Sequence, residues 1–340
     1  MRTILWRDGE VLTIDQSLLP NRLMWLKFRH SKGIISAIKT MKIRGAPVIG
    51  TAAAYALALE AHRGGTPSRS KLIKRLETTA SSLKKARPTG RNLSYAVDRV
   101  IEKAQEGRDL DQVKDLVIRE AQRLANEEAV IGKRLTEIGQ TLVCDGDRIL
   151  THCNSGELAT VAYGTALGAI IRAWRKGKRF SVIATETRPL LQGARLTAWE
   201  LKRAGVRFKL ITDSMIGYVL SERIVNKVMV GADRVWRDGS IANKIGTLTI
   251  AITARRFRVP FYVVAPISTF DFKGEPSQEI IEQRDPNEVL TFLGKRHTPS
   301  GIKVLNPAFD ITPARYITAI VTEHGVVRPP FRRGIKRLKA

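Results

Sequence analysis

The chain contains little cysteine, which limits how it can be stabilised and where it resides. Cys144 and Cys153 are the only cysteines among 340 residues. Two thiols are too few for a disulfide framework and suit a reducing compartment, although they leave a single bridge open. Charged residues also follow Met1 before any apolar stretch long enough for a signal peptide, so we expect a cytoplasmic protein.

Long apolar runs and metal-ligand spacings are lacking as well. The longest weakly polar run, residues 46–61, contains Glu60 and falls short of the roughly 20 apolar residues that span a bilayer. The five histidines lack HExxH spacing, and two cysteines cannot form a thiolate zinc cage. Neither a nucleotide P-loop nor a GxGxxG dinucleotide motif occurs. We therefore expect no membrane span, no metal and no ATP or NAD cofactor.

Acidic residues are scarce beside basic ones. The chain has 58 Lys and Arg against 32 Asp and Glu, a formal net charge of +26. Such an excess raises nucleic acid as a partner. However, the basic residues are scattered over many segments and do not form one stripe with interleaved aromatics. We interpret most of them as solvated helix faces that favour anionic substrates, and we do not expect nucleic acid or a membrane as a partner.

The first part of the chain has helical periodicity, and its length suggests two domains. Ile35, Ile38 and Met41 recur at three-residue spacing, and Pro47 favours the start of an alanine-rich helix that continues to His62. Short strands are expected before Gln16. Further helices are predicted over residues 69–86, 93–105 and 111–142. We place a mainly helical N-terminal domain at residues 1–143.

After residue 147 the pattern changes to short β-rich runs that alternate with helical runs. Strands are predicted over residues 148–153, 180–185, 207–212, 227–231 and 261–265. Helical stretches are predicted between them, at residues 158–175 and 190–204. Strands separated by helices of this length indicate right-handed crossovers and a parallel, doubly wound sheet. The sequence thus predicts an α/β protein with its parallel sheet in residues 144–340.

Polar side chains follow several of these predicted strands. Cys153, Glu186, Asp213 and Asp233 each fall at or just beyond a strand's carboxyl end. In an open parallel sheet those ends share one edge, where ligands bind. Four separate segments are therefore expected to deliver polar groups to one cleft.

The run 152–156, His-Cys-Asn-Ser-Gly, places a thiol just before a predicted helix N-terminus. Backbone N–H groups and the helix dipole at such a position favour a thiolate, which can serve as a base or a nucleophile. Taken alone, a buried structural cysteine is the commoner alternative for Cys153.

Two further runs have chemical and structural interpretations of similar weight. Asp233 ends an apolar strand, where a partly dry cleft raises a carboxyl pKa and suits a general acid, but a helix cap or an ion pair with Arg234 is as compatible. Asn243 and Lys244 lie at the predicted start of a helix, where N–H groups and a lysine form an anion site. A lysine on a helix surface is the alternative there.

Together, ordered motifs over nearly the whole chain resemble the methylthioribose-1-phosphate isomerase family. The similarity extends from Leu12 to Pro330, and it is specific because it rests on many motifs in order. They include Arg44-Gly45-Ala46-Pro47, Arg87-Pro88-Thr89, His152-Cys153-Asn154, Glu186-Thr187-Arg188-Pro189, Gln192-Gly193-Ala194-Arg195-Leu196-Thr197-Ala198-Trp199-Glu200, Gly231-Ala232-Asp233-Arg234, Asn243-Lys244-Ile245-Gly246-Thr247, Ser268-Thr269-Phe270-Asp271 and Asn306-Pro307-Ala308-Phe309-Asp310.

The resemblance implies a Rossmann-like catalytic domain at residues 144–340, homodimerisation, no cofactor, and an aldose–ketose isomerisation in methionine salvage. It implies Cys153 and Asp233 as the catalytic pair, and we assign Asp233 the acid role and Cys153 the proton-abstracting role, with an internal hydride shift as the rival. Arginine forks, a lysine charge and helix-end amides suit a sugar phosphate. The implied substrate-binding residues are Arg44, Gly45, Ala46, Arg87, Gln192, Asn243 and Lys244.

Two departures from the family pattern leave the substrate open. The usual Arg-Pro-Thr-Ala-Val-Asn stands here as Arg-Pro-Thr-Gly-Arg-Asn at residues 87–92, and the alanine after His-Cys-Asn is Ser155. We predict that Arg91 does not contact the substrate. The alternatives are a ribose-1,5-bisphosphate isomerase and a non-enzymatic subunit like those of the translation-initiation exchange factor. Those subunits generally lack the paired cysteine and aspartate, so an enzyme is preferred.

Overall fold

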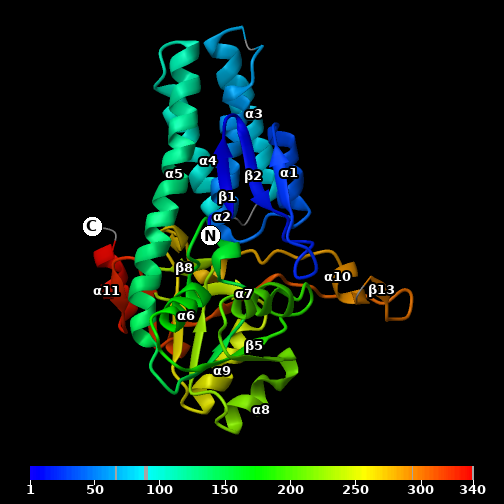
Figure 1. Cartoon of the computed structure of the whole chain (residues 1–340), viewed down its shortest axis with the longest axis vertical. Coiled ribbons are helices and arrows are strands. Elements are labelled where there is room, and N and C mark those ends of the chain that lie inside the picture. The colour runs from blue at the N-terminus through cyan, green and yellow to red at the C-terminus, as the bar shows by residue number, and fades with distance from the viewer. Residues whose placement is uncertain (66, 88–90, 293, 339–340) are drawn as a thin grey trace. The chain divides into compact units, whose positions relative to one another are not determined.

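The computed structural model in Figure 1 describes residues 1–65, 67–87, 91–292 and 294–338. The chain forms two compact units: Met1–Arg134 with Ser155–Thr165, and Leu135–Asn154 with Ala166–Ala340. The first unit is mainly helical and the second contains a parallel sheet, so the fold is mixed α/β. The first unit thus ends nine residues before the boundary at 143 and takes up a segment from beyond it. No helix in the described part of the chain is both long and apolar enough to cross a membrane.

In the first unit, helices surround one buried helix. Its elements are the antiparallel strands β1 (Ile4–Arg7), β2 (Glu10–Ile14) and β3 (Trp25–Phe28), and the helices α1 (Ser31–Lys39), α2 (Ala46–His62), α3 (Arg69–Ala86), α4 (Arg91–Gln105) and α5 (Leu110–Gly139). Almost every residue of α2 is buried, and α1, α3 and α4 pack against it. Its alanines permit this because small side chains let neighbouring helices approach on all sides. At Gly50, an added Cβ would meet the Asn92 carbonyl oxygen at 2.8 Å.

The predicted helices of this unit are confirmed with small shifts at their ends, and α2 carries Pro47 in its first turn as expected. Strand β3 was not predicted. Met41 was wrongly placed on a helical face: α1 ends at Lys39, and Met41 has a left-handed backbone with φ 60° where the chain turns toward α2. Residues 88–90, between the helices predicted over residues 69–86 and 93–105, lie outside the described residues.

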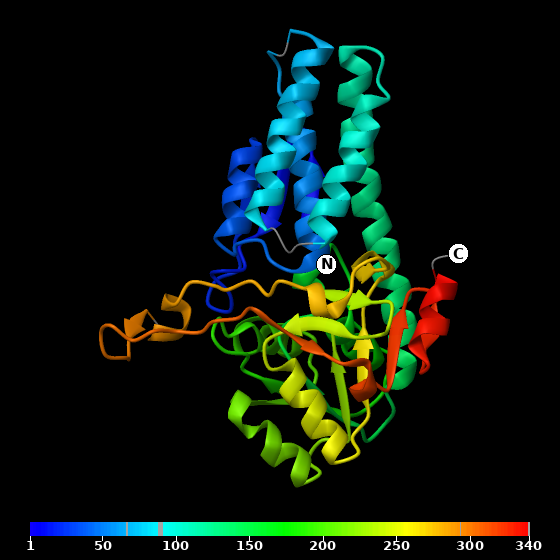
Figure 2. The ribbon, with the colours of Figure 1, turned by 180° about the vertical axis from the view of Figure 1, so that it is seen from behind.

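The second unit is built on a seven-stranded sheet, seen from two sides in Figures 1 and 2. Its order is β16-β15-β10-β7-β4-β5-β6, all pairs being parallel except that with β16. The six parallel strands thus have the chain order 3-2-1-4-5-6 of doubly wound folds. Their bounds are β4 (Arg148–Thr151), β5 (Ser181–Thr185), β6 (Phe208–Ile211), β7 (Lys227–Val230), β10 (Phe261–Val264), β15 (Ala319–Thr322) and β16 (Gly325–Val327).

Apolar residues alternate between the two faces of this sheet. Val228 and Val230 belong to one hydrophobic cluster and Met229 to another, and Val263 and Val264 divide in the same way. Such strands read as continuous apolar runs because both faces are covered. The first cluster includes residues of α8 (Ile216–Ser221), α9 (Thr247–Arg256) and α11 (Phe331–Leu338), and the second includes residues of α6 (Ala166–Arg175) and α7 (Ala198–Arg203).

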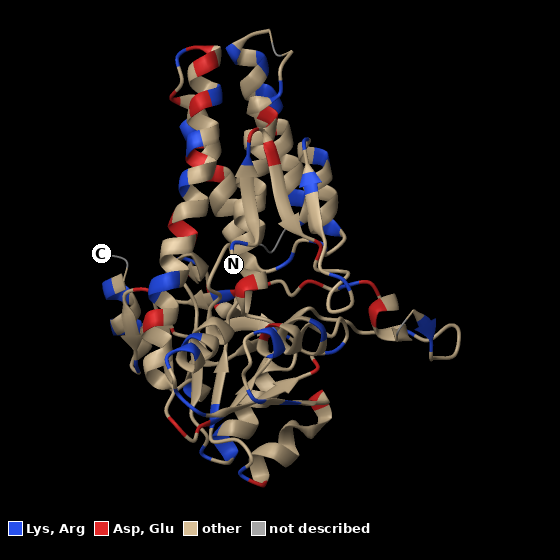
Figure 3. Cartoon of the chain, viewed as in Figure 1, with Lys and Arg blue, Asp and Glu red and all other residues tan. Residues whose placement is uncertain are grey.

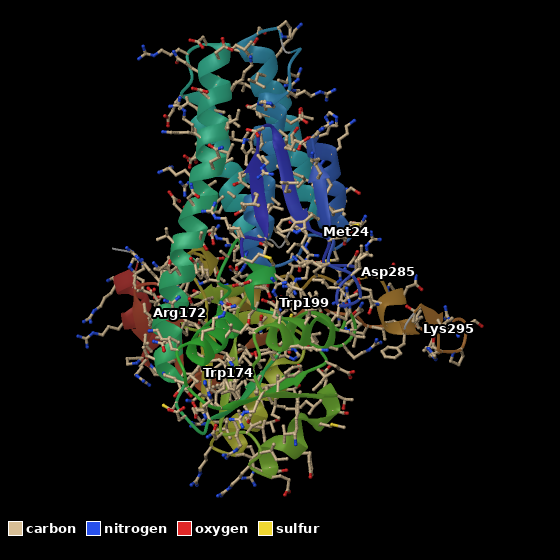
Figure 4. The ribbon with its side chains drawn as sticks, viewed as in Figure 1. Met24, Arg172, Trp174, Trp199, Asp285 and Lys295 are labelled. Carbon is tan, nitrogen blue, oxygen red and sulfur yellow. The ribbon has the colours of Figure 1, made fainter. Side chains whose placement is uncertain are left out.

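Five of the predicted strands correspond to β4, β5, β6, β7 and β10, whereas β15 and β16 were not predicted. The helix predicted over residues 158–175 is wrong at its start, because α6 begins only at Ala166 and residues 155–165 pack within the first unit. The helix predicted at 190–204 contains a π-helical turn, Gly193–Thr197, before α7. Side chains of α6 and α7, including Arg172, Trp174 and Trp199, are labelled in Figure 4.

A second, smaller sheet in this unit was not foreseen. Strands β11 (Phe270–Asp271), β8 (Arg234–Trp236), β9 (Ile241–Lys244) and β14 (Phe309–Thr312) pair in that order. Asn243 and Lys244 therefore lie in a strand, and the prediction that they begin a helix is wrong because α9 starts at Thr247. The remaining elements are short: α10 (Asn287–Leu290), β12 (Thr291–Phe292) and β13 (Lys295–Arg296).

Candidate active site

Cys153 and Asp233 follow neighbouring strands of the large sheet. Cys153 lies two residues beyond the end of β4, Asp233 lies three residues beyond the end of β7, and these strands pair in parallel. From β4 the chain continues to β5 and β6 on one side, and from β7 to β10 and β15 on the other. The two residues therefore flank the topological switch point at the carboxyl edge, where open α/β sheets bind ligands.

The main chain of Cys153 is held on both sides by threonine hydroxyls. Its N–H donates to Thr187 Oγ1 at 2.9 Å, and its carbonyl oxygen accepts from Thr197 Oγ1 at 2.6 Å. The residue has φ 59°, in the left-handed region that L residues avoid. The next α-helix begins only at Ala166, so the expectation of a helix N-terminus beside this thiol is wrong. Cys153 and Cys144 form no disulfide within the described chain.

A chain of buried hydroxyls connects Thr187 to His152. Thr187 Oγ1 lies 3.1 Å from Thr185 Oγ1, which lies 2.6 Å from His152 Nδ1. His152 Nε2 lies 2.9 Å from the carbonyl oxygen of Ile245, an acceptor, so this nitrogen carries the proton and Nδ1 accepts from Thr185. Burial lowers the pKa of His152, which keeps the ring neutral. His152 therefore has a structural role, since both ring nitrogens hydrogen-bond within the protein.

Thr187 is itself held in an uncommon conformation. It is fully buried and has φ 63°, a genuine outlier for a β-branched residue. The carboxylate of Asp213 accepts from the N–H of Thr187 at 2.9 Å and from that of Arg188 at 2.6 Å. Asp213 was expected to face the cleft as a functional group, but its oxygens accept main-chain hydrogen bonds and stabilise the turn at Thr187 and Arg188.

Gln192 lies at the start of the π-helical turn that carries Thr197. Its side chain is 3% exposed, and its Oε1 accepts no hydrogen bond from the described residues. A buried amide oxygen without a donor is costly, and a ligand hydroxyl would satisfy it. Gly193 brings this turn against β5, since an added Cβ would lie 1.8 Å from the Thr185 carbonyl oxygen.

Asp233 occupies the bend between β7 and β8. Its N–H donates to the Ala242 carbonyl oxygen at 2.9 Å. It precedes a strand, so it is not a helix cap. The guanidinium of Arg234 pairs with Glu279 at 2.5 Å and with Asp271 at 3.5 Å. The helix-cap alternative that the sequence left open for Asp233 is therefore wrong.

Asn243 and Lys244 are adjacent and buried at the end of β9. Asn243 Nδ2 donates to Thr247 Oγ1 at 3.0 Å, and Lys244 Nζ donates to the Ala308 carbonyl oxygen at 2.9 Å. The anion expected at the following helix end is supplied by the chain itself, since Asp310 accepts from the N–H groups of Gly246 and Leu248 at 2.7 and 3.0 Å. Two of the amides expected to serve a phosphate are thus occupied.

The remaining predicted binding residues lie in the first unit. Arg44 is buried, Gly45 caps α2 with φ 105°, and Ala46 is the first residue of that helix. An added Cβ at Gly45 would lie 2.3 Å from the Ala159 carbonyl oxygen, so only glycine allows this approach. The first turn of α2 holds no acidic residue, so its positive end remains available to an anion. Arg87 directly follows the last residue of α3, and its Nη1 donates to Met41 Sδ at 3.5 Å.

Among the described residues, no group of three or more His, Cys, Asp or Glu side chains is placed to hold a metal ion. Sequence reasoning missed Thr187, Thr197 and Asp310 as members of the site. All three lie within motifs that were recognised, but their roles depend on hydrogen bonds to distant segments. The only signal was their place in those motifs.

The fold and the strand-end residues define a doubly wound α/β protein with its polar site at the sheet's carboxyl edge. The chain belongs to the Initiation factor 2 subunit family, IF-2B, which matches residues 42–329.

Named relatives cover nearly the whole chain. A methylthioribose-1-phosphate isomerase of Dehalococcoides mccartyi is 46% identical over 96% of this chain and 98% of its own length. A 5-deoxyribose 1-phosphate isomerase of Moorella thermoacetica is also 46% identical, over 99% of this chain and 97% of its own.

Two solved structures are similar over almost their full length. That of 5-methylthioribose 1-phosphate isomerase from Pyrococcus horikoshii has a TM-score of 0.91 and 40% identity, covering 99% of this chain and 95% of that one. A structure described as translation initiation factor eIF-2B, subunit delta, from A. fulgidus has a TM-score of 0.88 and 42% identity, covering 100% of both.

Proposed function

We propose that the protein is an aldose–ketose isomerase that converts 5-methylthioribose 1-phosphate to 5-methylthioribulose 1-phosphate, a step of methionine salvage. The observation that supports the proposal is the placement of Cys153 and Asp233 just beyond the ends of the paired strands β4 and β7, at the switch point of the parallel sheet. Isomerases acting on sugar 1-phosphates that are 46% identical over nearly the whole chain support it. We propose that this Rossmann-like unit is the catalytic domain.

The chemistry requires two groups of different acidity. A sugar with phosphate on its anomeric oxygen cannot open its ring freely. Asp233 donates a proton to the ring oxygen, the bond from C1 to that oxygen breaks, and C1 becomes electron-poor. Cys153, as a thiolate, then removes the proton from C2, which forms a C1–C2 double bond. Asp233 takes the C2 hydroxyl proton while Cys153 returns its proton to C1, and both residues regain their starting states.

The proposed substrate-binding groups have the chemistry that a phosphate and a sugar require. Lys244 supplies a charge, Asn243 an amide, and Gln192 a buried amide oxygen that a sugar hydroxyl would satisfy. The family resemblance adds Arg44, Gly45, Ala46 and Arg87 of the first unit as phosphate contacts. Homodimerisation and a cytoplasmic location complete the proposal as expectations from the resemblance and the sequence.

The test is conversion of the pure sugar phosphate by the purified protein, followed with two variants. Cys153→Ser and Asp233→Asn should each lose most of kcat while still binding substrate, because the proposed work of both residues lies in the transition state. Turnover unchanged in either variant would remove that residue from the mechanism. A wild-type protein that converts no sugar 1-phosphate would overturn the isomerase proposal itself.

The candidate sugar phosphates differ in the group at C5, so the chemistry of the pocket around C5 determines which one is preferred. A thioether and a methyl group suit apolar walls, whereas a second phosphate needs cationic donors. We expect kcat/KM to be higher for 5-methylthioribose 1-phosphate than for 5-deoxyribose 1-phosphate or ribose 1,5-bisphosphate. Arg91 is exposed at the start of α4, and Arg91→Ala should leave this order unchanged. A preference for the bisphosphate that Arg91→Ala erases would replace the proposed substrate.

The non-enzymatic alternative rests on the similarity to a structure described as an initiation-factor subunit. The retained thiol and carboxylate favour the enzyme, because a regulatory subunit needs neither. The absence of isomerisation together with tight, salt-sensitive RNA binding would favour the alternative.

A further inference from the structure

An arginine-lined cavity lies at the opposite edge of the large sheet from Cys153 and Asp233. Its volume is about 1060 Å³, which is in the range of small-molecule sites. Pro260 and Thr318 line it and immediately precede β10 and β15, so it belongs to the amino edge of the strands. It is therefore distinct from the site described above.

Five arginines from three separate segments line this cavity. They are Arg255, Arg256, Arg258, Arg315 and Arg332. The first three come from the end of α9 and the turn after it, the fourth from the 3-10 turn Ala314–Tyr316, and the last from the first turn of α11. Among the described lining residues there is no lysine and one carboxylate, that of Asp238, which accepts from Ser240 N and Oγ.

None of these five arginines forms an ion pair with another described residue. Elsewhere in the same unit, Arg234, Arg237 and Arg284 each pair with a glutamate. Basic residues are spread over the whole chain (Figure 3), so an excess of cations alone explains single unpaired arginines. It does not explain why five gather around one concavity, where they repel one another. The negative end of the α9 dipole favours cations in the last turn, but this explains only Arg255 and Arg256.

We propose that this cavity is a binding site for a small polyphosphate anion. Guanidinium forks match phosphate oxygens in pairs, and a chain of phosphates would neutralise several forks at once. Val259 and Ile317 add apolar surface to the cavity wall. The proposal does not depend on the isomerase activity.

The cavity fits a phosphate chain better than a nucleic acid. Single-stranded nucleic acids bind through aromatic platforms beside basic grooves. Here Phe331 is 4% exposed, and the guanidinium of Arg315 covers the ring of Tyr316 at 4.8 Å. Phe331 is thus closed to base stacking and Arg315 covers one face of Tyr316, so recognition in the proposed site rests on the phosphates.

Calorimetric titration of the full-length protein at about 150 mM salt tests this site, with inorganic tripolyphosphate and ATP as probes. Tripolyphosphate and ATP should bind with affinities within about threefold of each other if the phosphate chain is what the cavity recognises. ATP binding at least about tenfold more tightly would identify a nucleotide as the source of the same phosphate chain.

The structure offers a matched pair of variants. Arg255→Gln with Arg332→Gln removes two cavity cations, whereas Arg333→Gln with Lys336→Gln removes two charges from the exposed face of α11 that do not line the cavity. The first should weaken tripolyphosphate binding at least about tenfold, and the second by less than about twofold. Arg315→Gln serves as a single variant if the double variant fails a thermal-melting check.

Four results would overturn the proposal. The first three are no binding of either probe by the wild type, equal weakening in both double variants, and an RNA oligonucleotide that binds more tightly than tripolyphosphate and is weakened by the cavity variants. A change of oligomeric mass in the cavity variants, without any binding by the wild type, would also overturn it, because it assigns the surface to a second copy of the chain.

Discussion

The main-chain N–H of Cys153 donates to the side-chain hydroxyl of Thr187 at 2.9 Å, and both residues have positive φ, 59° and 63°. A left-handed backbone costs a non-glycine residue about 1–2 kcal/mol. Two strained residues, one just beyond β4 and one just beyond β5, therefore support each other, and the hydroxyl of Thr187 fixes where the Cys153 side chain begins. Strained backbone conformations of this kind are common at functional sites, where the surrounding structure holds them in place.

Thr187→Val keeps the side-chain shape and removes the acceptor of the Cys153 N–H. Leaving that group unsatisfied costs about 1–3 kcal/mol of folding free energy. We expect kcat to fall roughly ten- to hundredfold, because small displacements of a reacting group have effects of that size. Steady-state kinetics and urea unfolding measure the two effects. Thr187→Ser retains the hydroxyl and should restore most of kcat; if it does not, the hydrogen bond is not the cause.

The neutral state of His152 predicts a loss of stability in acid. Burial lowers the pKa of His152 below its ordinary value of 6.5, so the unfolded chain binds this proton more readily than the folded one. The contribution of neutral His152 to the free energy of unfolding is fully present above pH 6.5. It is lost as the pH falls below 6.5, by up to about 1.4 kcal/mol per pH unit. Urea unfolding of the wild type and His152→Gln at pH 7.5 and 6.0 measures it. Equal pH dependence in the two proteins would contradict the prediction.

The raised pKa of Asp310 predicts the opposite pH dependence of stability. Burial raises the pKa of Asp310 from 3.8 to about 6, despite the N–H groups of Leu248 and Gly246 and the charge of Lys244, which lower it. The folded state therefore holds this proton more strongly than the unfolded state. The resulting stabilisation is present below pH 3.8 and disappears as the pH rises through about 6. The stability of the wild type relative to Asp310→Asn should thus be greater at pH 5 than at pH 7, by about 1–2 kcal/mol. A difference that does not vary with pH would show that Asp310 does not titrate in this way.

The proton-transfer mechanism predicts isotope exchange. Run in deuterated water, the reaction should place deuterium at C1 of the ketose, because the proton that Cys153 removes from C2 exchanges with solvent before it is returned. Mass spectrometry of the product measures the incorporation. Complete retention of the substrate hydrogen would favour an internal hydride shift, in which Cys153 does not carry the hydrogen.

Strands with continuous apolar runs could be predicted because their signal is local. Val228, Met229 and Val230 form such a run, and β7 was located within one residue of its end. Strand β9 could not be predicted in the same way. Asn243 and Lys244 have no strand periodicity. Their neighbours Ile241 and Ala242 pair with β8, and Asn243 and Lys244 themselves are extended because Asp310 and Phe309 of β14 pair with them. That pairing joins residues more than 60 positions apart in the chain.

The same distinction between local signals and contacts of distant segments applies to the site. The sequence by itself led to the proposal that Cys153 and Asp233 carry the chemistry, because they stand just beyond apolar strands in ordered motifs that resemble those of the isomerase family. Only the tertiary structure decided how they are held. The expected helix dipole beside Cys153 is replaced by the hydroxyls of Thr187 and Thr197, and Asp310 occupies the helix end expected to bind phosphate. Residue type is a property of one position, whereas a hydrogen bond between segments depends on the folded path of both.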